Sequence, residues 1–267
     1  MTEGEVHELV ERITEKLYVT GAKVMVFWED KYSYTIVSRV DKIGVMAFKV
    51  AQDLSKIPRS QLIDLAVMYK AFGVKPLIVT ETRNNERLKN GVMYEHIGLP
   101  LMNVETLNRV LTGEPIRLKS EGGVIKVKVK GELLKERRLR YGLSLGDLAE
   151  LLSVSRKAVY EYERGSIGMS AEKAQILIEL FGEDIVDEWA ITVRDPENRV
   201  KERLVNIDRL GQIKVREMYL LTHSHGKYAV VSDNEKFLMG EEENREAEEL
   251  SDVLGVKYVT VDSVKRP

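Results

Sequence analysis

The spacing of hydrophobic residues changes repeatedly along the first 115 positions of the chain. Between residues 3 and 19 the apolar positions follow a period close to 3.6, which predicts an amphipathic helix. A second helical pattern covers residues 58–72, with Ser60 as its expected N-cap and Gly73 at its end. The alternation of strands and helices predicts a layered α/β domain over residues 1–115. The expected strands are 23–28, 34–37, 44–50, 75–80, 92–94 and 101–104, with a hairpin turn at 40–44 and a third helix at 105–111.

Strict alternation of apolar and basic residues marks the stretch that follows, over residues 124–130. This pattern predicts a strand inside a linker that spans residues 116–131. Between Arg117 and Lys130 there are five basic residues and one acid, Glu121, which gives a local charge of +4. Such a strand can neutralise phosphates, or it can be a sheet edge that lysines protect from aggregation. The lysines on its one face are Lys126, Lys128 and Lys130.

Three short helical patterns separated by tight turns follow between residues 133 and 165. Ser144 is placed to cap the second helix, with Asp147 as a capping-box partner, and Ser155 is placed to cap the third. These positions predict a helical domain over residues 132–190. The side chains expected to point inward from the second and third helices are Leu148, Ala149, Leu152, Val159 and Tyr162.

The second and third helices are joined by a three-residue turn that contains Ser153-Val154, so together they form a helix-turn-helix. The third helix begins with Arg156 and Lys157 at its exposed end, where recognition helices meet base edges and phosphates. An isolated Arg-Lys pair would more often be a solvated helix end. Within this motif the pair favours DNA contact.

The stretch from Leu133 to about Leu180 closely resembles the Cro/C1-type (XRE) helix-turn-helix family. The resemblance is carried by Leu148-Ala149, Val154-Ser155, Val159 and Glu163-Arg164-Gly165. It implies a five-helix domain and assigns a role to each matching position. Arg156, Lys157 and Glu161 fall where the family reads bases, and Ser155, Tyr160 and Arg164 fall near phosphates. Arg138 and Glu163 fall where the family has a buried ion pair, and Ser144 is a further DNA-binding candidate.

Two positions depart from that family's pattern. Leu145 stands where a polar residue usually contacts phosphate, and Ser153 replaces the usual turn glycine. A serine there has to adopt a left-handed backbone conformation at some energetic cost.

The whole chain also resembles a group of archaeal HTH-type transcriptional regulators with an α/β domain, a basic strand, a helix-turn-helix and a C-terminal domain. The strings that match this group are Asn84, Gly91–Tyr94 and Gly98–Val104. This resemblance implies DNA binding and little further biochemistry.

The N-terminal element order resembles the restriction-endonuclease-like nuclease core, which needs an acid near its second strand and an acid-x-Lys triplet on its third. Here Lys49 is present, but Ala47 stands in place of the acid, and the strand 34–37 has no carboxylate. We therefore expect an inactive relative, used for binding or dimerisation, with no catalytic residue, no metal and no cofactor. His223 and His225 are expected to be exposed rather than metal-bound, because no third ligand lies nearby in the sequence.

The C-terminal part, residues 195–267, returns to strand–helix alternation after a linker at Asp195–Asn198. Residues 75–107 are echoed by residues 227–264 if one five-residue insertion is allowed. This echo predicts a small α/β domain that resembles half of the N-terminal one. The alternative is that two small α/β units converged on similar strings.

Composition narrows the functional classes. The 267 residues include no cysteine, which excludes disulfides, thiolate zinc sites and a cysteine nucleophile. The net charge of −2 excludes an overall basic field, so DNA contacts must come from a local patch. The acidic start and the lack of a long apolar run favour a soluble cytoplasmic protein without membrane contact.

The sequence therefore predicts a sequence-specific transcriptional regulator that binds double-stranded DNA as a homodimer and is not an enzyme. Two alternatives remain open: a structure-specific DNA repair protein derived from a nuclease fold, and a protein-interaction adaptor.

Overall fold

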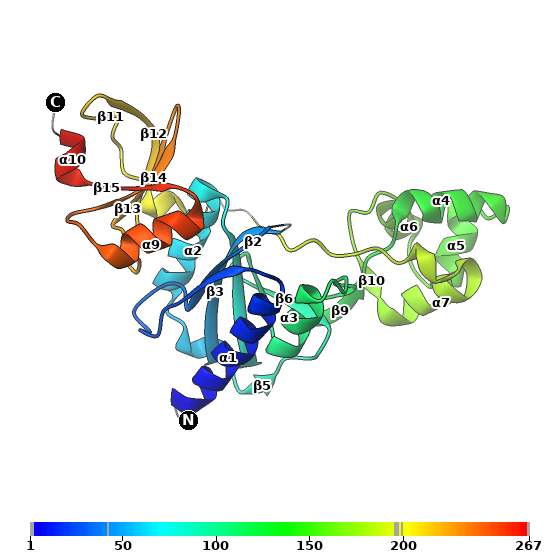
Figure 1. Cartoon of the computed structure of the whole chain (residues 1–267). Coiled ribbons are helices and arrows are strands. Elements are labelled where there is room, and N and C mark those ends of the chain that lie inside the picture. Colours follow the sequence, from blue (N-terminus) through cyan, green and yellow to red (C-terminus); the bar gives the residue numbers. More distant parts are fainter. Residues whose placement is uncertain (1–2, 42, 195–197, 199, 266–267) are drawn as a thin grey trace. The chain divides into compact units, whose positions relative to one another are not determined.

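The computed structural model describes residues 3–41, 43–194, 198 and 200–265 (Figure 1). Two compact units are formed by these residues, and each is described by itself. The first unit combines the chain up to Leu88, residues 96–111 and the chain from Thr192 onward. The second unit consists of residues 89–95 and 112–191. Among the described residues, no helix is both long and apolar enough to cross a membrane.

The N-terminal part of the first unit is built on a mixed sheet with the order β1-β2-β3-β4-β7. The strands β1, β2 and β3 are antiparallel, whereas β3, β4 and β7 run parallel. Helix α1 contacts β1, β2 and β3 through its apolar stripe, as its 3.6-residue spacing predicts. The elements are α1 (Glu3–Val19), β1 (Lys23–Val26), β2 (Ile36–Val40), β3 (Gly44–Asp53), η1 (Leu54–Lys56), α2 (Arg59–Phe72), β4 (Lys75–Arg83), β5 (Glu86–Arg87), β7 (Leu99–Met102) and α3 (Val104–Leu111).

Several predicted boundaries in this part were wrong. The second strand begins at Ile36 rather than at residue 34, and the third continues to Asp53 because β4 runs beside it that far. Ser60 does not cap α2: the cap is Pro58, which makes no side-chain hydrogen bond, and Ser60 lies in the first turn. The hairpin predicted at 40–44 includes Lys42, which lies outside the described residues.

The C-terminal part of the first unit is a five-stranded sheet with the order β11-β12-β13-β14-β15. The strand β13 pairs with β12 and β14, and the parallel neighbour of β15 is β14. The predicted echo matched β13 to β4 and β15 to β7. That register was wrong, because β4 and β7 are direct neighbours whereas β14 separates β13 from β15. The elements are η3 (Lys201–Arg203), β11 (Arg209–Leu210), β12 (Ile213–Leu220), β13 (Tyr228–Ser232), β14 (Lys236–Gly240), α9 (Arg245–Leu254), β15 (Lys257–Thr260) and α10 (Val261–Lys265).

The second unit joins a short strand ladder, in the order β6-β8-β9-β10, to a helical domain. Its apolar core includes Leu134, Leu148, Val159 and Leu177, one from each of the helices α4 to α7. Gly131 opens α4 against the C-terminal end of α6, where an added Cβ would collide with the backbone carbonyl of Glu163. The elements are β6 (Val92–His96), β8 (Leu118–Glu121), β9 (Val124–Val127), α4 (Gly131–Arg140), α5 (Leu145–Leu151), α6 (Arg156–Glu163), β10 (Met169–Ser170), α7 (Ala171–Phe181) and η2 (Glu183–Ile185).

The basic strand predicted over 124–130 is shorter than expected. It ends at Val127, because the next residues pair with a different segment of the chain: Val129 forms an isolated bridge with Val186. The amide of Lys130 donates to the carbonyl oxygen of Ile185, and α4 then begins. In the described part of this unit, four α-helices and the 3-10 helix η2 stand where five helices were expected. The linker predicted at Asp195–Asn198 lies largely outside the described residues.

Candidate nucleic-acid interface and nuclease-like pocket

The start of each helix in the helix-turn-helix is fixed by a serine, as predicted. The Ser144 hydroxyl accepts a hydrogen bond from the amide of Asp147 at 3.1 Å, and the Asp147 carboxylate accepts from the Ser144 amide at 2.7 Å. The Ser155 hydroxyl accepts from the amide of Ala158 at 3.1 Å and caps α6. Each hydroxyl keeps its own proton, which remains available to donate to a phosphate oxygen.

The turn between α5 and α6 has the expected strained residue. Ser153 has φ +50°, in the left-handed region that favours glycine. The inward side chains of the two helices are buried where the sequence predicts them, and Leu148 and Val159 are fully buried. The turn and the core together fix how α6 is presented.

A buried ion pair connects α4 to α6. The Arg138 guanidinium donates to both carboxylate oxygens of Glu163, from Nε at 2.5 Å and from Nη2 at 3.2 Å. A third guanidinium hydrogen bond, from Nη1, goes to the carbonyl oxygen of Leu143 at 2.9 Å. Both side chains are more than 90% buried, so the structure brings together the two residues to which the resemblance assigns an ion pair.

The side chains expected to touch DNA lie mostly on the exposed side of α6. Arg156, Lys157, Tyr160 and Arg164 are exposed, and Glu161 is half-buried. The Arg164 guanidinium lies 5.6 Å from the centre of the Tyr160 ring, so these two side chains support each other. Several cationic and aromatic groups are thus presented on one short helix.

The lysines of the basic stretch are more compensated than the sequence indicates. Lys126 lies 3.3 Å from Glu121, and Lys128 lies 2.9 Å from Asp187, which is distant in the sequence. Lys130 is exposed at the start of α4. The local charge of +4 already counts Glu121, and Asp187, which lies outside the stretch, lowers it further.

A cavity of about 380 Å³ lies in the first unit beside β3 and the start of α2. It contains Lys49, the residue of the acid-x-Lys triplet that this chain retains. Its polar lining includes Glu5, Asp30, Lys49, Asp53, Lys56 and Gln61. Among the described residues, no group of three or more His, Cys, Asp or Glu side chains is arranged to hold a metal ion.

Lys49 is held by main-chain atoms rather than by carboxylates. Its ammonium donates to the carbonyl oxygen of Tyr32 at 2.7 Å and to that of Asp30 at 3.3 Å. Burial lowers the pKa of Lys49 to about 8, and the nearby Asp30 opposes this shift only partly. Ala47, at the acid position, is completely buried.

Asp53 is the buried carboxylate closest to this lysine along β3, but its oxygens are already engaged. Oδ1 accepts from the Ser55 amide at 2.8 Å, and Oδ2 accepts from the Thr82 hydroxyl at 2.6 Å and the Asn85 amide at 2.9 Å. These hydrogen bonds, led by that of Ser55, lower the pKa of Asp53 well below its usual range. The carboxylate stabilises a loop and offers little to a metal ion.

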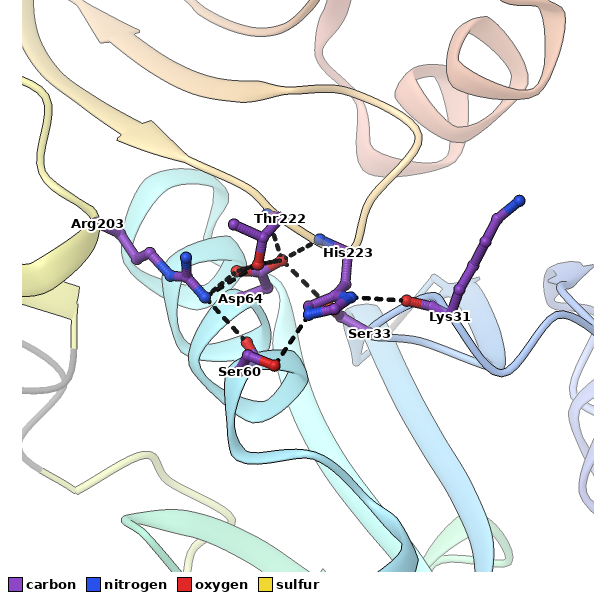
Figure 2. Close-up of polar contacts among 7 residues, drawn as sticks. All are labelled: Lys31, Ser33, Ser60, Asp64, Arg203, Thr222 and His223. Carbon is purple, nitrogen blue, oxygen red and sulfur yellow. Dashed lines mark hydrogen bonds and ion pairs between the residues drawn. The ribbon is translucent and has the colours of Figure 1, made fainter.

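A buried polar cluster that sequence reasoning missed joins α2 to the C-terminal part of the first unit (Figure 2). Asp64 is completely buried, and its Oδ2 accepts from the amides of Thr222 at 2.8 Å and His223 at 2.7 Å. Ser33 and Arg203 complete its surroundings, at 3.3 and 3.5 Å. The available signal was an acid on a helix whose neighbours, residues 62–68, are otherwise apolar.

The two histidines near this cluster are not exposed as expected. His223 Nδ1 lies 3.0 Å from the carbonyl oxygen of Lys31, to which it donates, and Nε2 lies 2.9 Å from the Ser60 hydroxyl. The His225 ring is buried and stacks on Tyr32, with ring centres 3.8 Å apart. Burial lowers the pKa of His225, which keeps the ring neutral. Both histidines thus serve packing between chain segments.

Comparison with known proteins gives two family matches. The profile of the PD-(D/E)XK superfamily domain matches residues 6–116, and that of a helix-turn-helix domain matches residues 131–189. No solved structure matches the chain significantly. The fold and the site therefore define a helix-turn-helix protein that carries a nuclease-like α/β domain.

Archaeal relatives specify the family further. A protein of Aeropyrum pernix named "Putative HTH-type transcriptional regulatory protein" is 30% identical over 236 residues, which cover 85% of this chain and 71% of the relative. Relatives of the same type from Thermococcus gammatolerans and Pyrococcus furiosus are 38% and 34% identical, over 54% and 66% of this chain and 45% and 59% of their own lengths. The chain belongs to this family of archaeal HTH-type transcriptional regulatory proteins.

The buried ion pair leads to a test of stability. Glu163→Gln should destabilise the helical domain by about 3–5 kcal/mol, because it leaves the Arg138 charge buried and unpaired. Combining Arg138→Met with Glu163→Leu should recover much of this loss, since an apolar pair removes both desolvation penalties. A double-mutant cycle by thermal unfolding measures the coupling. The exposed pair Arg140–Glu136 on the same helix is the matched control, with an expected coupling of about 0.3–0.5 kcal/mol. Equal coupling in the two pairs would contradict this account.

The buried lysine of the pocket leads to a test of pH dependence. The folded protein releases the Lys49 proton near pH 8, whereas the unfolded chain holds it to about 10.5, so between these values the unfolded state binds more protons. Stability relative to the Lys49→Met variant should therefore rise across this window, by up to about 3 kcal/mol. Thermal unfolding from pH 7 to 10.5 measures this difference, with Lys56→Met as the exposed control. Parallel curves for wild type and Lys49→Met would show that the lysine is not desolvated.

Proposed function

We propose that this chain is a sequence-specific, DNA-binding transcriptional regulator that places α6 in the major groove of double-stranded DNA. The observation that carries the proposal is the exposed basic start of α6, Arg156 and Lys157, on a helix held by the Ser155 cap and the buried Arg138–Glu163 pair. A rigidly held recognition helix keeps its side chains in register with base edges. Family membership and the helix-turn-helix match support the same function.

The side chains divide by expected role. Arg156, Lys157 and Glu161 read bases, while Ser144, Ser155, Tyr160 and Arg164 hold phosphates. Lys130 supports them from the start of α4, because it is exposed and makes no ion pair among those found in the described residues. Lys126 and Lys128 contribute less, since each has to leave its carboxylate partner before it can neutralise a phosphate.

The proposed organisation follows from this function. Residues 1–115 form the nuclease-like domain, 116–131 the linker, 132–190 the five-helix Cro/C1-type domain, and 195–267 a small α/β domain related to part of the first. The protein acts in the cytoplasm as a homodimer, because one short helix contacts too few base pairs to select a site in a genome. It is not an enzyme and needs no cofactor.

A DNA repair nuclease is the second candidate, because the nuclease-like core retains Lys49 and a cavity beside it. The replacement of the acid by Ala47 and the engaged oxygens of Asp53 argue against cleavage. Incubation of the protein with supercoiled and branched DNA and magnesium tests this candidate directly. DNA that stays intact supports the regulator, whereas cleavage by the wild type that is lost in Lys49→Met would establish the nuclease instead.

Sequence recognition is tested at the start of α6. Arg156→Ala and Lys157→Ala should each lose about 1–3 kcal/mol of discrimination between the selected duplex and a scrambled one, because a lost bidentate base contact costs that much. Gel shifts after selection from a random DNA pool give the measurement. Lys135→Ala, which removes an exposed lysine from α4, is the matched control and should keep the wild-type preference. If both α6 variants retain that preference, the helix does not read bases. If the wild type binds no DNA at all, the adaptor alternative gains support.

A further inference from the structure

The two parts of the first unit have the same order and direction of elements. The first runs β1-β2-β3-α2-β4, and the second runs β12-β13-β14-α9-β15. In each part, three antiparallel strands are followed by a helix and by a fourth strand parallel to the third. This register of the internal repeat differs from the one that the sequence echo indicated.

The ends of the two helices match residue by residue. α2 ends at Gly73 with φ +77°, and α9 ends at Gly255 with φ +72°, both left-handed. Each glycine is followed by a valine and by a lysine that begins the parallel strand. Lys75 lies opposite Met46, and Lys257 lies opposite Phe237, so the strands are paired in the same register after the same turn.

The contacts between the two parts are reciprocal. Helix α2 packs on β12 and β13 of the second part, and helix α9 packs on β1 and β2 of the first. Lys70 of α2 lies 3.7 Å from Glu217 of β12, and Arg39 of β2 donates to the carbonyl oxygen of Val253 in α9 at 2.9 Å. Equivalent elements that exchange equivalent contacts are the signature of a two-fold interface.

One loop beside this interface, residues 222–225, is held by matching positions of the two helices. Asp64 and Glu246 each lie nine residues before the left-handed glycine of their helix. The Asp64 carboxylate accepts hydrogen bonds from the amides of Thr222 and His223 (Figure 2). A carboxylate oxygen of Glu246 lies 2.9 Å from Nε2 of His225. The Tyr34 hydroxyl, from the matching loop of the first part, lies 2.8 Å from Nδ1 of the same histidine.

The second part lacks the polar residue that marks the nuclease-like pocket. Lys49 pairs with Ile78, three residues beyond Lys75 on β4. The residue that pairs with the matching position of β15, Thr260, is Gly240, so a glycine occupies the place of the lysine. A side chain there would collide with the Tyr258 hydroxyl. The second part therefore retains the pairing surface without the lysine, and the cavity of about 450 Å³ at the matching place is lined by Gly240, Asn244 and Tyr258 instead.

We propose that residues 213–260 are a second, shortened copy of the core formed by residues 23–83, and that the two copies pair as an internal dimer. The first copy pairs through α2, β1 and β2, and the partner that covers this surface is the second copy of the same fold in the same chain. This surface is closed within each molecule, so a homodimer of the chain has to form through a different surface.

Coupling across the interface tests the proposal in the full chain. Asp64→Asn should speed amide hydrogen exchange in α9 by about tenfold, although Asp64 contacts the other side of the interface. Arg39→Met should in turn speed exchange at Thr222 and His223. Asp53→Asn is the matched control. It also removes a buried, hydrogen-bonded carboxylate, but the partners of Asp53 all belong to the N-terminal part of the unit, so the variant should leave α9 unchanged. If each variant loosens only the residues it contacts, the two contacts are independent and there is no paired interface.

The molecular mass in solution gives a second test of the paired interface. The Asp64→Asn/Arg39→Met variant should form a concentration-dependent species of twice the wild-type mass by light scattering, because a freed pairing surface finds the same surface on a second chain. A variant with faster exchange in α9 but with the wild-type mass at all concentrations would overturn the proposal. If the double variant does not fold, the same mass measurement on the single variant Arg39→Met decides the question. The Arg39 side chain is half-buried and is not part of the core.

Discussion

A carboxylate taken out of water must be surrounded by hydrogen-bond donors, and this constraint determines how both units are put together. In the helical unit the donors around Glu163 come from the Arg138 guanidinium, so α6 has one orientation relative to α4. In the first unit the donors around Asp64 come from the amides of residues 222 and 223, from Ser33 and from Arg203. Burial still raises the pKa of Asp64, so its donors have to be kept in place.

For the proposed DNA binding, the charge of the helical unit is the next constraint. The helical unit has no excess positive charge, and the lysines beside it are mostly paired, so electrostatic attraction to any DNA is modest. The proposed sequence recognition therefore depends on well-placed base contacts. The caps, the strained turn at Ser153 and the buried ion pair all serve this placement, since each fixes the direction of α6.

Local sequence predicted local structure well where a side chain acts on its own backbone. The caps at Ser144 and Ser155 could be foreseen because capping and helix spacing act over three or four residues. The helix register of the helix-turn-helix followed for the same reason. The strain at Ser153 was expected only from the resemblance, in which a glycine usually occupies this turn. The Arg138–Glu163 contact was found only through the resemblance, because nothing local brings residues on two different helices together.

The remaining features depend on long-range packing. The backbone donors to Asp64, at Thr222 and His223, and the partners of the His223 ring, Lys31 and Ser60, lie more than 150 residues away in the sequence, so no local pattern reports them. The sequence did not indicate an ion pair for Lys128, because its partner Asp187 follows at the other end of the helical domain. The internal repeat was noticed but matched in the wrong register, since similar strand strings fit several alignments and only strand pairing distinguishes them.

The central claim is that DNA is read by α6 and that the nuclease-like pocket stays outside the interface. Amide NMR of the full chain during titration with a duplex selected from a random pool tests this most directly. The account predicts chemical-shift changes at residues 144–147 and 155–164, with the amides of Lys49 and Gln61 unchanged. Chemical-shift changes at the pocket residues, with the amide shifts of α6 unchanged, would contradict the account.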